Sequence, residues 1–166
     1  MNIEEKMNLT FELAQEALQK GEFPIAAVIF LDDKVIAQSY TTEKSDKRYL
    51  IHAELKALIE ADKKGFTIKE RKRMQLFVTL EPCMMCLGAA MSFFIGEIYY
   101  SLEAPIDGAV KTAKDWNPHS DDFPEYALPQ IQGGILRENC KELFHQYTIE
   151  NNPSPMNDFA KSLALL

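Results

Sequence analysis

An almost unbroken apolar run, PIAAVIFL at residues 24–31, constrains the fold of this chain more than any other feature. A strand with one face in water would alternate apolar and polar residues. This run has no polar position, which is typical of a strand buried on both faces. Asp32-Asp33 then form a short turn, and residues 34–41 predict a second strand that returns as a hairpin. The chain must therefore supply helices for both faces of a sheet.

Helical patterns stand on both sides of this hairpin. Apolar residues at helical spacing predict a helix over 3–20 that ends at Gly21, and another over 52–64. Pro82 fits the first turn of a further helix, which ends before Gly96. The remaining expected elements are a loop at 42–50, strands at 75–80, 97–101 and 129–132, and a helix at 136–148. This order predicts a three-layer α/β/α domain around a mixed sheet.

The length of 166 residues suits one domain. We expect that domain to cover residues 1–150 and a short tail to cover 151–166. The tail predicts a docking helix with one apolar face, formed by Met156, Phe159, Ala160, Leu163 and Leu166. Such a face must be covered, either by its own domain or by a second subunit.

Several features bear on location. No run of about 18 apolar residues is present, so no membrane span is expected. The N-terminal segment is acidic and lacks the basic start and apolar core of a signal peptide. Two of the three cysteines, Cys83 and Cys86, are too close for a typical structural disulfide, and Cys140 is interpreted as a buried apolar residue. We therefore expect a cytoplasmic protein.

The formal net charge of −7 argues against a broad nucleic-acid-binding face, because phosphate contacts need clustered lysines and arginines. One local exception exists. Six basic residues fall within eleven positions: Lys63, Lys64, Lys69, Arg71, Lys72 and Arg73. The simpler interpretation is a solvated loop between a helix and a strand, and the alternative is a nucleic-acid contact.

Two short motifs stand at predicted helix starts, His52-Ala53-Glu54 and Pro82-Cys83-Met84-Met85-Cys86. Ligands of open α/β sheets gather at the carboxyl ends of strands, where such helices begin, so we expect the two starts to point at one place. Cys83 and Cys86 are three residues apart, which brings both sulfurs to one side of a helical turn. Imidazole nitrogen and thiolate sulfur are zinc ligands. The predicted metal ligands are His52, Cys83 and Cys86.

Three protein ligands leave a fourth tetrahedral position open for water, as in catalytic zinc sites. Zinc lowers the pKa of bound water toward neutrality, and a nearby group must then move protons. Glu54, two residues after the histidine, is the candidate general acid–base. The alternative for Glu54 is an ordinary carboxylate in the first turn of a helix. A lone C-x-x-C would equally suit structural zinc or a redox pair.

H-A-E followed by P-C-x-x-C is the signature of zinc deaminases that act on nucleobases. The chain resembles the cytidine deaminase superfamily, and within it the tRNA-specific adenosine deaminases and the related guanine and nucleoside deaminases. The segments that carry the resemblance are GEFPIAAVIF, KVIAQSY, HAELKAL, FVTLEPCMMCLGAAM, IGEIYYS, DGAV and GGILRENC. The resemblance implies a cytidine-deaminase-like fold, a five-stranded sheet in the order 2-1-3-4-5 and usually a homodimer. It also implies zinc on His52, Cys83 and Cys86, with Glu54 as the proton shuttle.

Other positions depart from the tRNA-editing pattern. Thr41 stands where the family usually has a substrate-binding Asn, and Tyr49-Leu50-Ile51 replaces a Pro-Thr-Ala run. Ala104 and Ile106 occupy positions that meet RNA in the tRNA-editing branch. The tail ends in FAKSLALL instead of a basic segment. We therefore expect a small substrate, a free base or a nucleoside with a purine ring slightly preferred.

The candidate substrate contacts surround the two motifs. Thr41 could offer a hydroxyl, and Ala53 lies between the histidine and the glutamate. Three aromatic residues could stack on a ring: Phe23, Tyr49 and Trp116. Core packing is the alternative for each aromatic residue. Trp116 belongs to an expected irregular lid over 102–127. Two other functions stay open: editing of a tRNA wobble adenosine to inosine, and a zinc-binding module without catalysis.

Overall fold

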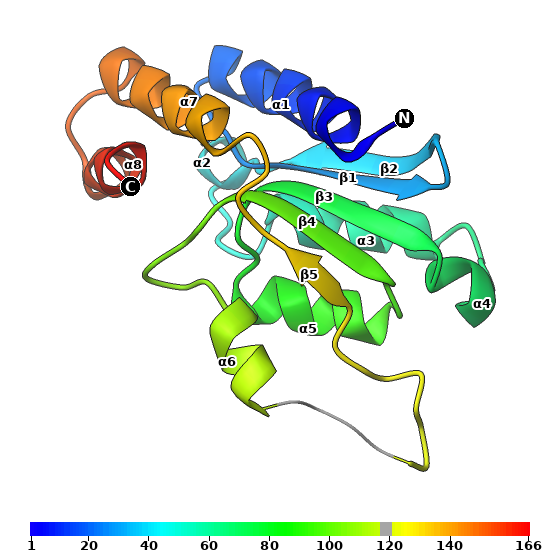
Figure 1. The fold of residues 1–166 in the computed structure, drawn as a ribbon. Helices are drawn as coiled ribbons and strands as arrows, with labels where there is room; N and C mark the ends of the chain where they lie inside the picture. Colours follow the sequence, from blue (N-terminus) through cyan, green and yellow to red (C-terminus); the bar gives the residue numbers. More distant parts are fainter. Residues whose placement is uncertain (117–120) are drawn as a thin grey trace.

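A computed structural model describes residues 1–116 and 121–166. Its centre is a five-stranded sheet in the order β2-β1-β3-β4-β5, which confirms the expected arrangement (Figure 1). The first strand is antiparallel to both of its neighbours, while β3, β4 and β5 run parallel to one another. The strand bounds are β1 Ala26–Leu31, β2 Lys34–Tyr40, β3 Met74–Leu80, β4 Glu97–Leu102 and β5 Gln130–Gln132.

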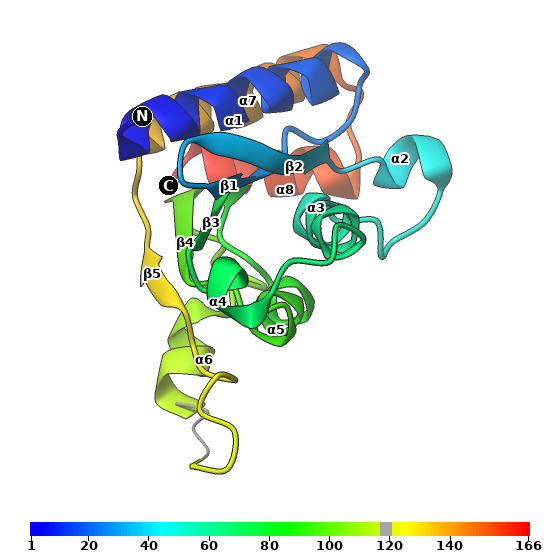
Figure 2. The same cartoon turned by 90° about the vertical axis from the view of Figure 1, so that its right-hand side faces the viewer.

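Helices cover both faces of this sheet, as its apolar strands require. Helices α1 and α7 lie side by side on one face, and α3 and α5 lie on the other (Figures 1 and 2). The helix bounds are α1 Ile3–Gln19, α2 Glu43–Asp46, α3 Ala53–Asp62, α4 Ile68–Arg71, α5 Met84–Ser92, α6 Val110–Trp116, α7 Arg137–Glu150 and α8 Pro155–Ala164. None of these helices is both long and apolar enough to cross a membrane within the described part of the chain.

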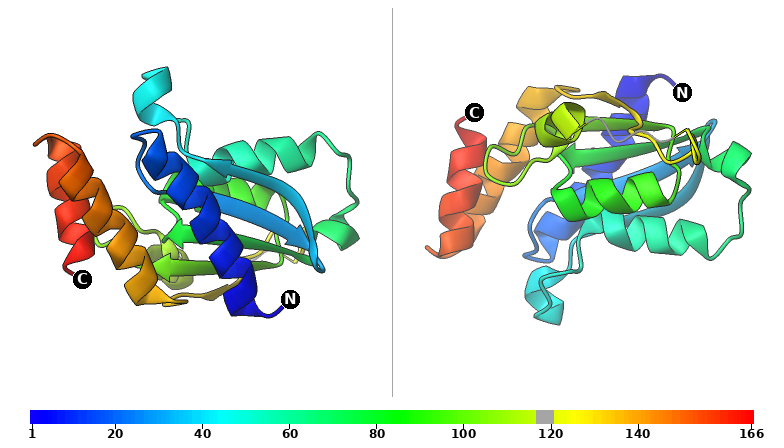
Figure 3. Two further views of the ribbon diagram at one scale, coloured as in Figure 1. Left: turned by 90° about the horizontal axis from the view of Figure 1, so that it is seen from above. Right: turned by 90° about the horizontal axis from the view of Figure 1, so that it is seen from below.

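A third apolar cluster lies at one end of the sheet. The last residues of β3 and β4, Leu80 and Leu102, pack there with residues of α7 and α8. The tail helix α8 begins at Pro155 with Ser154 as its cap, and it docks on α7 of the same chain (Figure 3). This docking places α8 beyond the carboxyl ends of β3 and β4, where the two predicted motifs also lie.

Three short helices were not expected. Helix α2 lies in the polar segment 42–50, and α6 lies inside the expected lid over 102–127, of which residues 117–120 are outside the described residues. Helix α4 begins with a capping box in which Thr67 and Glu70 satisfy each other's backbone N–H groups. Pro82 is not in the first turn of α5, because Cys83 is the N-cap residue and Pro82 precedes it.

The basic segment 63–73 lies at the far end of α3 from His52. Arg71 forms an ion pair with Asp62 at 2.7 Å, and Arg73 pairs with Asp32. These charges are thus partly neutralised by neighbouring carboxylates, which favours the solvated interpretation over a nucleic-acid contact. Cys140 is fully buried on α7, as expected, and its thiol donates to the carbonyl of Thr79.

Candidate active site

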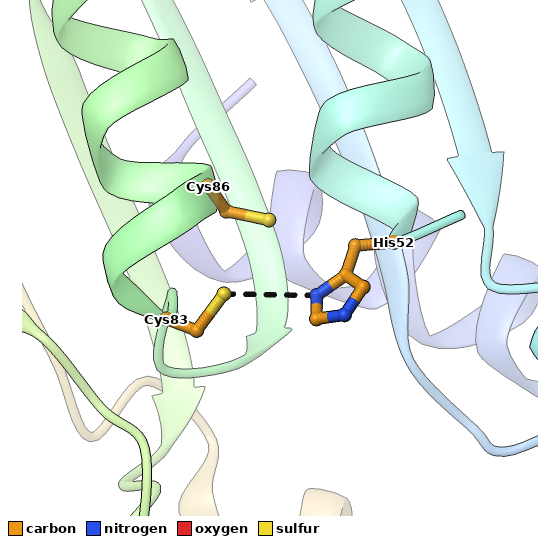
Figure 4. Close-up of side chains that lie close together, drawn as sticks. All are labelled: His52, Cys83 and Cys86. Atoms are coloured by element: carbon orange, nitrogen blue, oxygen red, sulfur yellow. Dashed lines mark hydrogen bonds between the residues drawn. The ribbon is translucent and has the colours of Figure 1, made fainter. Parts of the chain in front are cut away.

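The starts of α3 and α5 lie side by side and carry the two predicted motifs (Figure 4). His52 is the N-cap residue of α3, Cys83 is the N-cap residue of α5, and Cys86 lies one turn further on (Figure 4). One ligand atom from each of the three side chains lies within 4.8 Å of the others. Nδ1 of His52 stands 3.7 Å from Sγ of Cys83. The two helix starts therefore bring one imidazole and two thiols to one place.

The geometry of this cluster suits a metal ion. Tetrahedral zinc with ligand distances of about 2.0 Å to nitrogen and about 2.3 Å to sulfur separates the two atoms by about 3.5 Å. The separation of 3.7 Å between His52 and Cys83 is close to this value. Among the described residues, this is the one group of three or more His, Cys, Asp or Glu side chains found to be arranged for a metal.

Shared protons link the three side chains of the cluster when no metal is bound. A hydrogen bond from the Cys86 thiol, together with the nearby His52, lowers the pKa of Cys83 to about 4. The same contact with Cys83, followed by burial, raises the pKa of Cys86. Hydrogen bonds to Cys83 and then to Glu43 raise the pKa of His52 to about 10. Without a metal, the Cys83 thiolate therefore faces a protonated His52, and zinc would bind as the imidazole and the Cys86 thiol release their protons.

Glu54 is a buried carboxyl group beside this cluster. Its Oε2 atom has no hydrogen-bond partner among the described residues. Burial raises its pKa from 4.5 to about 7. A carboxyl group that is poised near neutrality, with one free oxygen, can both accept and donate a proton during a reaction.

Two adjoining cavities open next to Glu54. The inner one has a volume of about 220 Å³, and its lining includes His52, Glu54 and Cys83. The outer one has a volume of about 670 Å³. The two share four lining residues: Phe23, Thr41, Glu43 and Met156. The two cavities therefore adjoin, and the inner one reaches the cluster.

The predicted substrate contacts divide into two groups. Phe23, Thr41 and Ala53 all line the inner cavity, although the Thr41 hydroxyl already donates to the carbonyl of Ile51 at 3.0 Å. Trp116 is not brought to this space. It ends α6 with 62% of its surface exposed, and it is not among the described residues that line either cavity.

Several residues that line the inner cavity were missed from the sequence. Met156 and Phe159 reach the inner cavity from α8, and Phe159 stacks on Phe23 with ring centroids 5.8 Å apart. Asp107 lines the same cavity, and burial raises its pKa. The apolar face of the tail was a readable signal for the first two, but the periodicity does not say what that face covers.

Comparison with known proteins now bears on this arrangement. The MafB19-like deaminase family matches residues 1–138. The chain belongs to that family. As a member it is a deaminase, an enzyme that acts on C–N bonds. Its catalytic character argues against a zinc module without activity and against a redox C-x-x-C pair.

Curated relatives of this deaminase point to the same superfamily. It is 31% identical over 127 residues to a tRNA-specific adenosine deaminase of Bacillus subtilis, with 76% of each chain covered. It is 38% identical over 141 residues to a tRNA(Ile)-lysidine synthase of Deinococcus radiodurans. That match covers 84% of this deaminase but only 23% of the larger relative.

Solved structures share the fold. A tRNA:A34 deaminase superposes with a TM-score of 0.69 at 28% identity, covering 82% of this deaminase and 96% of that chain. A guanine deaminase from Nitrosomonas europaea superposes with a TM-score of 0.66 at 22% identity, covering 88% and 85%. The resemblance to the cytidine deaminase superfamily, and to its tRNA adenosine deaminase branch, is thereby confirmed.

Proposed function

We propose that this deaminase removes an exocyclic amino group, as ammonia, from a free nucleobase or nucleoside. It would hold one zinc ion on His52, Cys83 and Cys86. The cavity that ends at these residues and at the unpartnered oxygen of Glu54 is the observation that carries the proposal. When bound, zinc would act as a Lewis acid that makes water a nucleophile near neutral pH.

Glu54 would carry the protons in this reaction. Its free Oε2 would accept one proton from the attacking water and donate it to a ring nitrogen. It would then take the second proton from the hydroxyl group now bonded to the ring carbon and pass it to the amine, so that the C=O bond forms as the C–N bond breaks and ammonia leaves. The overall change replaces C–NH2 by C=O and consumes one water for each ammonia released. A pKa raised to about 7 suits both directions of transfer.

The size of the inner cavity supports a small substrate. Pockets that enclose drug-sized ligands measure about 300–1,000 Å³. The 220 Å³ here is suited to a single ring system, and the outer cavity could receive a sugar. Met156 and Phe159 form part of the inner wall, so the tail helix narrows the space that a polynucleotide would need. A purine ring is slightly preferred because the relatives include purine deaminases.

A screen for ammonia release tests this proposal. The zinc-loaded protein would be given free bases, nucleosides and a tRNA anticodon stem-loop in parallel. We expect release from at least one base or nucleoside and none from the stem-loop. Release from the stem-loop alone would favour the second candidate, tRNA wobble editing, which the identity to the Bacillus subtilis enzyme supports.

The expected homodimer stays a prediction. Several apolar side chains near the helix starts are exposed, among them Tyr49, Leu50 and Met84. A second subunit could cover them. Light scattering combined with size exclusion would measure the mass, and a value near 18.9 kDa would contradict the dimer.

A further inference from the structure

The second ring nitrogen of His52 has a partner of its own. Nε2 lies 3.0 Å from Oε1 of Glu43, while Nδ1 faces Cys83. Both the histidine and the glutamate are only partly exposed. The imidazole is therefore held between a carboxylate on one side and the thiol cluster on the other.

Glu43 lies on a helix that is too short to be stable on its own. It is the first residue of α2, which has four residues, none of them buried. The side chain of its cap residue Thr42 does not cap the helix and instead donates to Asp46 Oδ2 at 2.6 Å. Helices this short are unstable without outside contacts. The position of the Glu43 carboxylate must therefore be set by other parts of the chain.

A buried carboxylate provides that support. Glu22 is only 3% exposed, and its two oxygens accept from the backbone N–H groups of Lys44 and Ser45 at 3.2 and 2.8 Å. Glu22 directly follows Gly21, whose φ of +72° ends α1, and its own N–H donates to the carbonyl of Ala17. The rigid end of α1 thus fixes the first turn of α2.

A lysine adds a second contact. The Nζ atom of Lys44 donates to the carbonyl of Gly21 at 2.9 Å and to Oδ1 of Asn151 at 3.0 Å. The short helix is therefore tied both to the end of α1 and to the segment between α7 and α8. These contacts limit the freedom of Glu43.

We propose that Glu43 positions the imidazole of His52, and that Glu22 positions Glu43. The inference rests on the proposed metal site, and it concerns residues that do not touch the substrate's reacting atoms. In the neutral imidazole, which is the form that binds a metal, donation of Nε2–H to Glu43 directs the lone pair of Nδ1 at the cluster. Carboxylate partners of this kind typically raise metal affinity about 10–100-fold.

Four variants test the two steps. Glu43→Ala removes the acceptor, and Glu43→Gln keeps an oxygen that can accept. Glu22→Gln leaves only one acceptor for two N–H groups. Glu60→Gln, on the exposed part of α3, is the matched control. Zinc affinity would be measured by competition with a chromophoric chelator, and the Nε2–H proton of His52 by NMR in the metal-free protein.

We expect Glu43→Ala to weaken zinc binding about 10–100-fold and to speed solvent exchange of the Nε2–H proton. Glu43→Gln should lie between this variant and the wild type, and Glu22→Gln should change both readouts in the same direction by less. If Glu43→Ala left both the solvent-exchange rate of the Nε2–H proton and the zinc affinity unchanged, the proposal would be overturned. Unchanged values in Glu22→Gln, with effects in Glu43→Ala, would overturn its second step.

The proton measurement needs neither metal nor substrate, so it separates this proposal from the proposed function. A wild type that binds no zinc would defeat the metal site, while the exchange rates would still judge the role of Glu43. Circular dichroism would show whether Glu22→Gln folds. If it does not, Glu22→Asp, which keeps the carboxylate but draws both acceptor oxygens back by one methylene group, tests the second step, and normal exchange in that variant would overturn it.

Discussion

The carboxylate of Glu81 fills the space that a side chain at Gly108 would need. An ideal Cβ at position 108 would lie 2.5 Å from Cδ of Glu81. Glu81 also accepts from the backbone N–H groups of Ala104 and Val110, and Gly108 forms a bridge with Cys83. The segment after β4 is thus fastened to the start of α5, next to the cluster.

Gly108→Ala should destabilise the protein by roughly 1–3 kcal/mol, because the methyl group forces either Glu81 or the backbone to move. Urea unfolding would measure the change. Gly88→Ala is the matched control, since no atom lies within 4 Å of its added Cβ and α5 should gain about 0.5–1 kcal/mol from the alanine. Equal effects in the two variants would contradict the close packing of Glu81.

Loss of one proposed ligand should remove the metal. Residues that only hydrogen-bond to a metal ligand contribute about 10–100-fold to metal affinity, and a direct thiolate ligand contributes more. We therefore expect Cys83→Ser to contain less than one zinc ion per chain. Cys140→Ser is the control, as its hydroxyl can still donate to Thr79 in the core. Elemental analysis would measure zinc per chain, and full occupancy in Cys83→Ser would refute the ligand assignment.

Glu54→Gln should lower the rate of ammonia release by at least about 10²-fold while zinc stays bound, because the amide cannot carry protons. Stability should not fall, since burial already disfavours the charged form of Glu54. Steady-state kinetics and thermal unfolding would measure both. Glu60→Gln, exposed on the same helix, should change neither. Full activity in Glu54→Gln would exclude Glu54 as the residue that transfers the protons.

Met156→Ala should raise KM for a small substrate by up to about tenfold with little change in kcat, because Met156 lines both cavities but does not reach the reacting groups. Leu165→Ala, exposed beyond the end of α8, is the control and should leave KM unchanged. If the two variants gave the same KM, α8 would not form part of the substrate site.

The raised pKa of Tyr99 predicts that the protein loses stability at high pH. Burial and the hydrogen bond to Glu97 raise the pKa of Tyr99 from 10.0 to about 12. The unfolded chain therefore releases this proton first, so the contribution is complete below pH 10 and is lost as the pH rises to about 12. Denaturant unfolding at pH 8 to 12 should show a shallower decline for Tyr99→Phe. If stability fell equally with pH in the wild type and in Tyr99→Phe, the raised pKa of Tyr99 would be contradicted.

The sheet and the grouping of the two cysteines were predictable because short-range patterns specify them. The apolar run at 24–31 predicts a strand that is covered by helices on both faces. The three-residue spacing of Cys83 and Cys86 predicts that both sulfurs lie on the same side of one helical turn. Strand order, in contrast, came from the family resemblance rather than from any local pattern.

The missed features depend on contacts between distant residues. Helix α2 has no apolar periodicity, and a carboxylate more than twenty positions earlier holds it in place. Helix α4 was readable from its capping box, Thr67 and Glu70, and was overlooked. Phe159 lines the inner cavity because α8 packs against α7. The apolar stripe of the tail predicts that α8 packs on a surface, but it does not say on which one.

The family match ends at residue 138, and α8 begins at Pro155. The proposed chemistry and the wall formed by Met156 and Phe159 therefore belong to separate stretches of the chain. Exchanging the tail between related deaminases would then be a direct route to new substrate preferences, because such chimeras would inherit one catalytic centre and differ in the shape of the space above it.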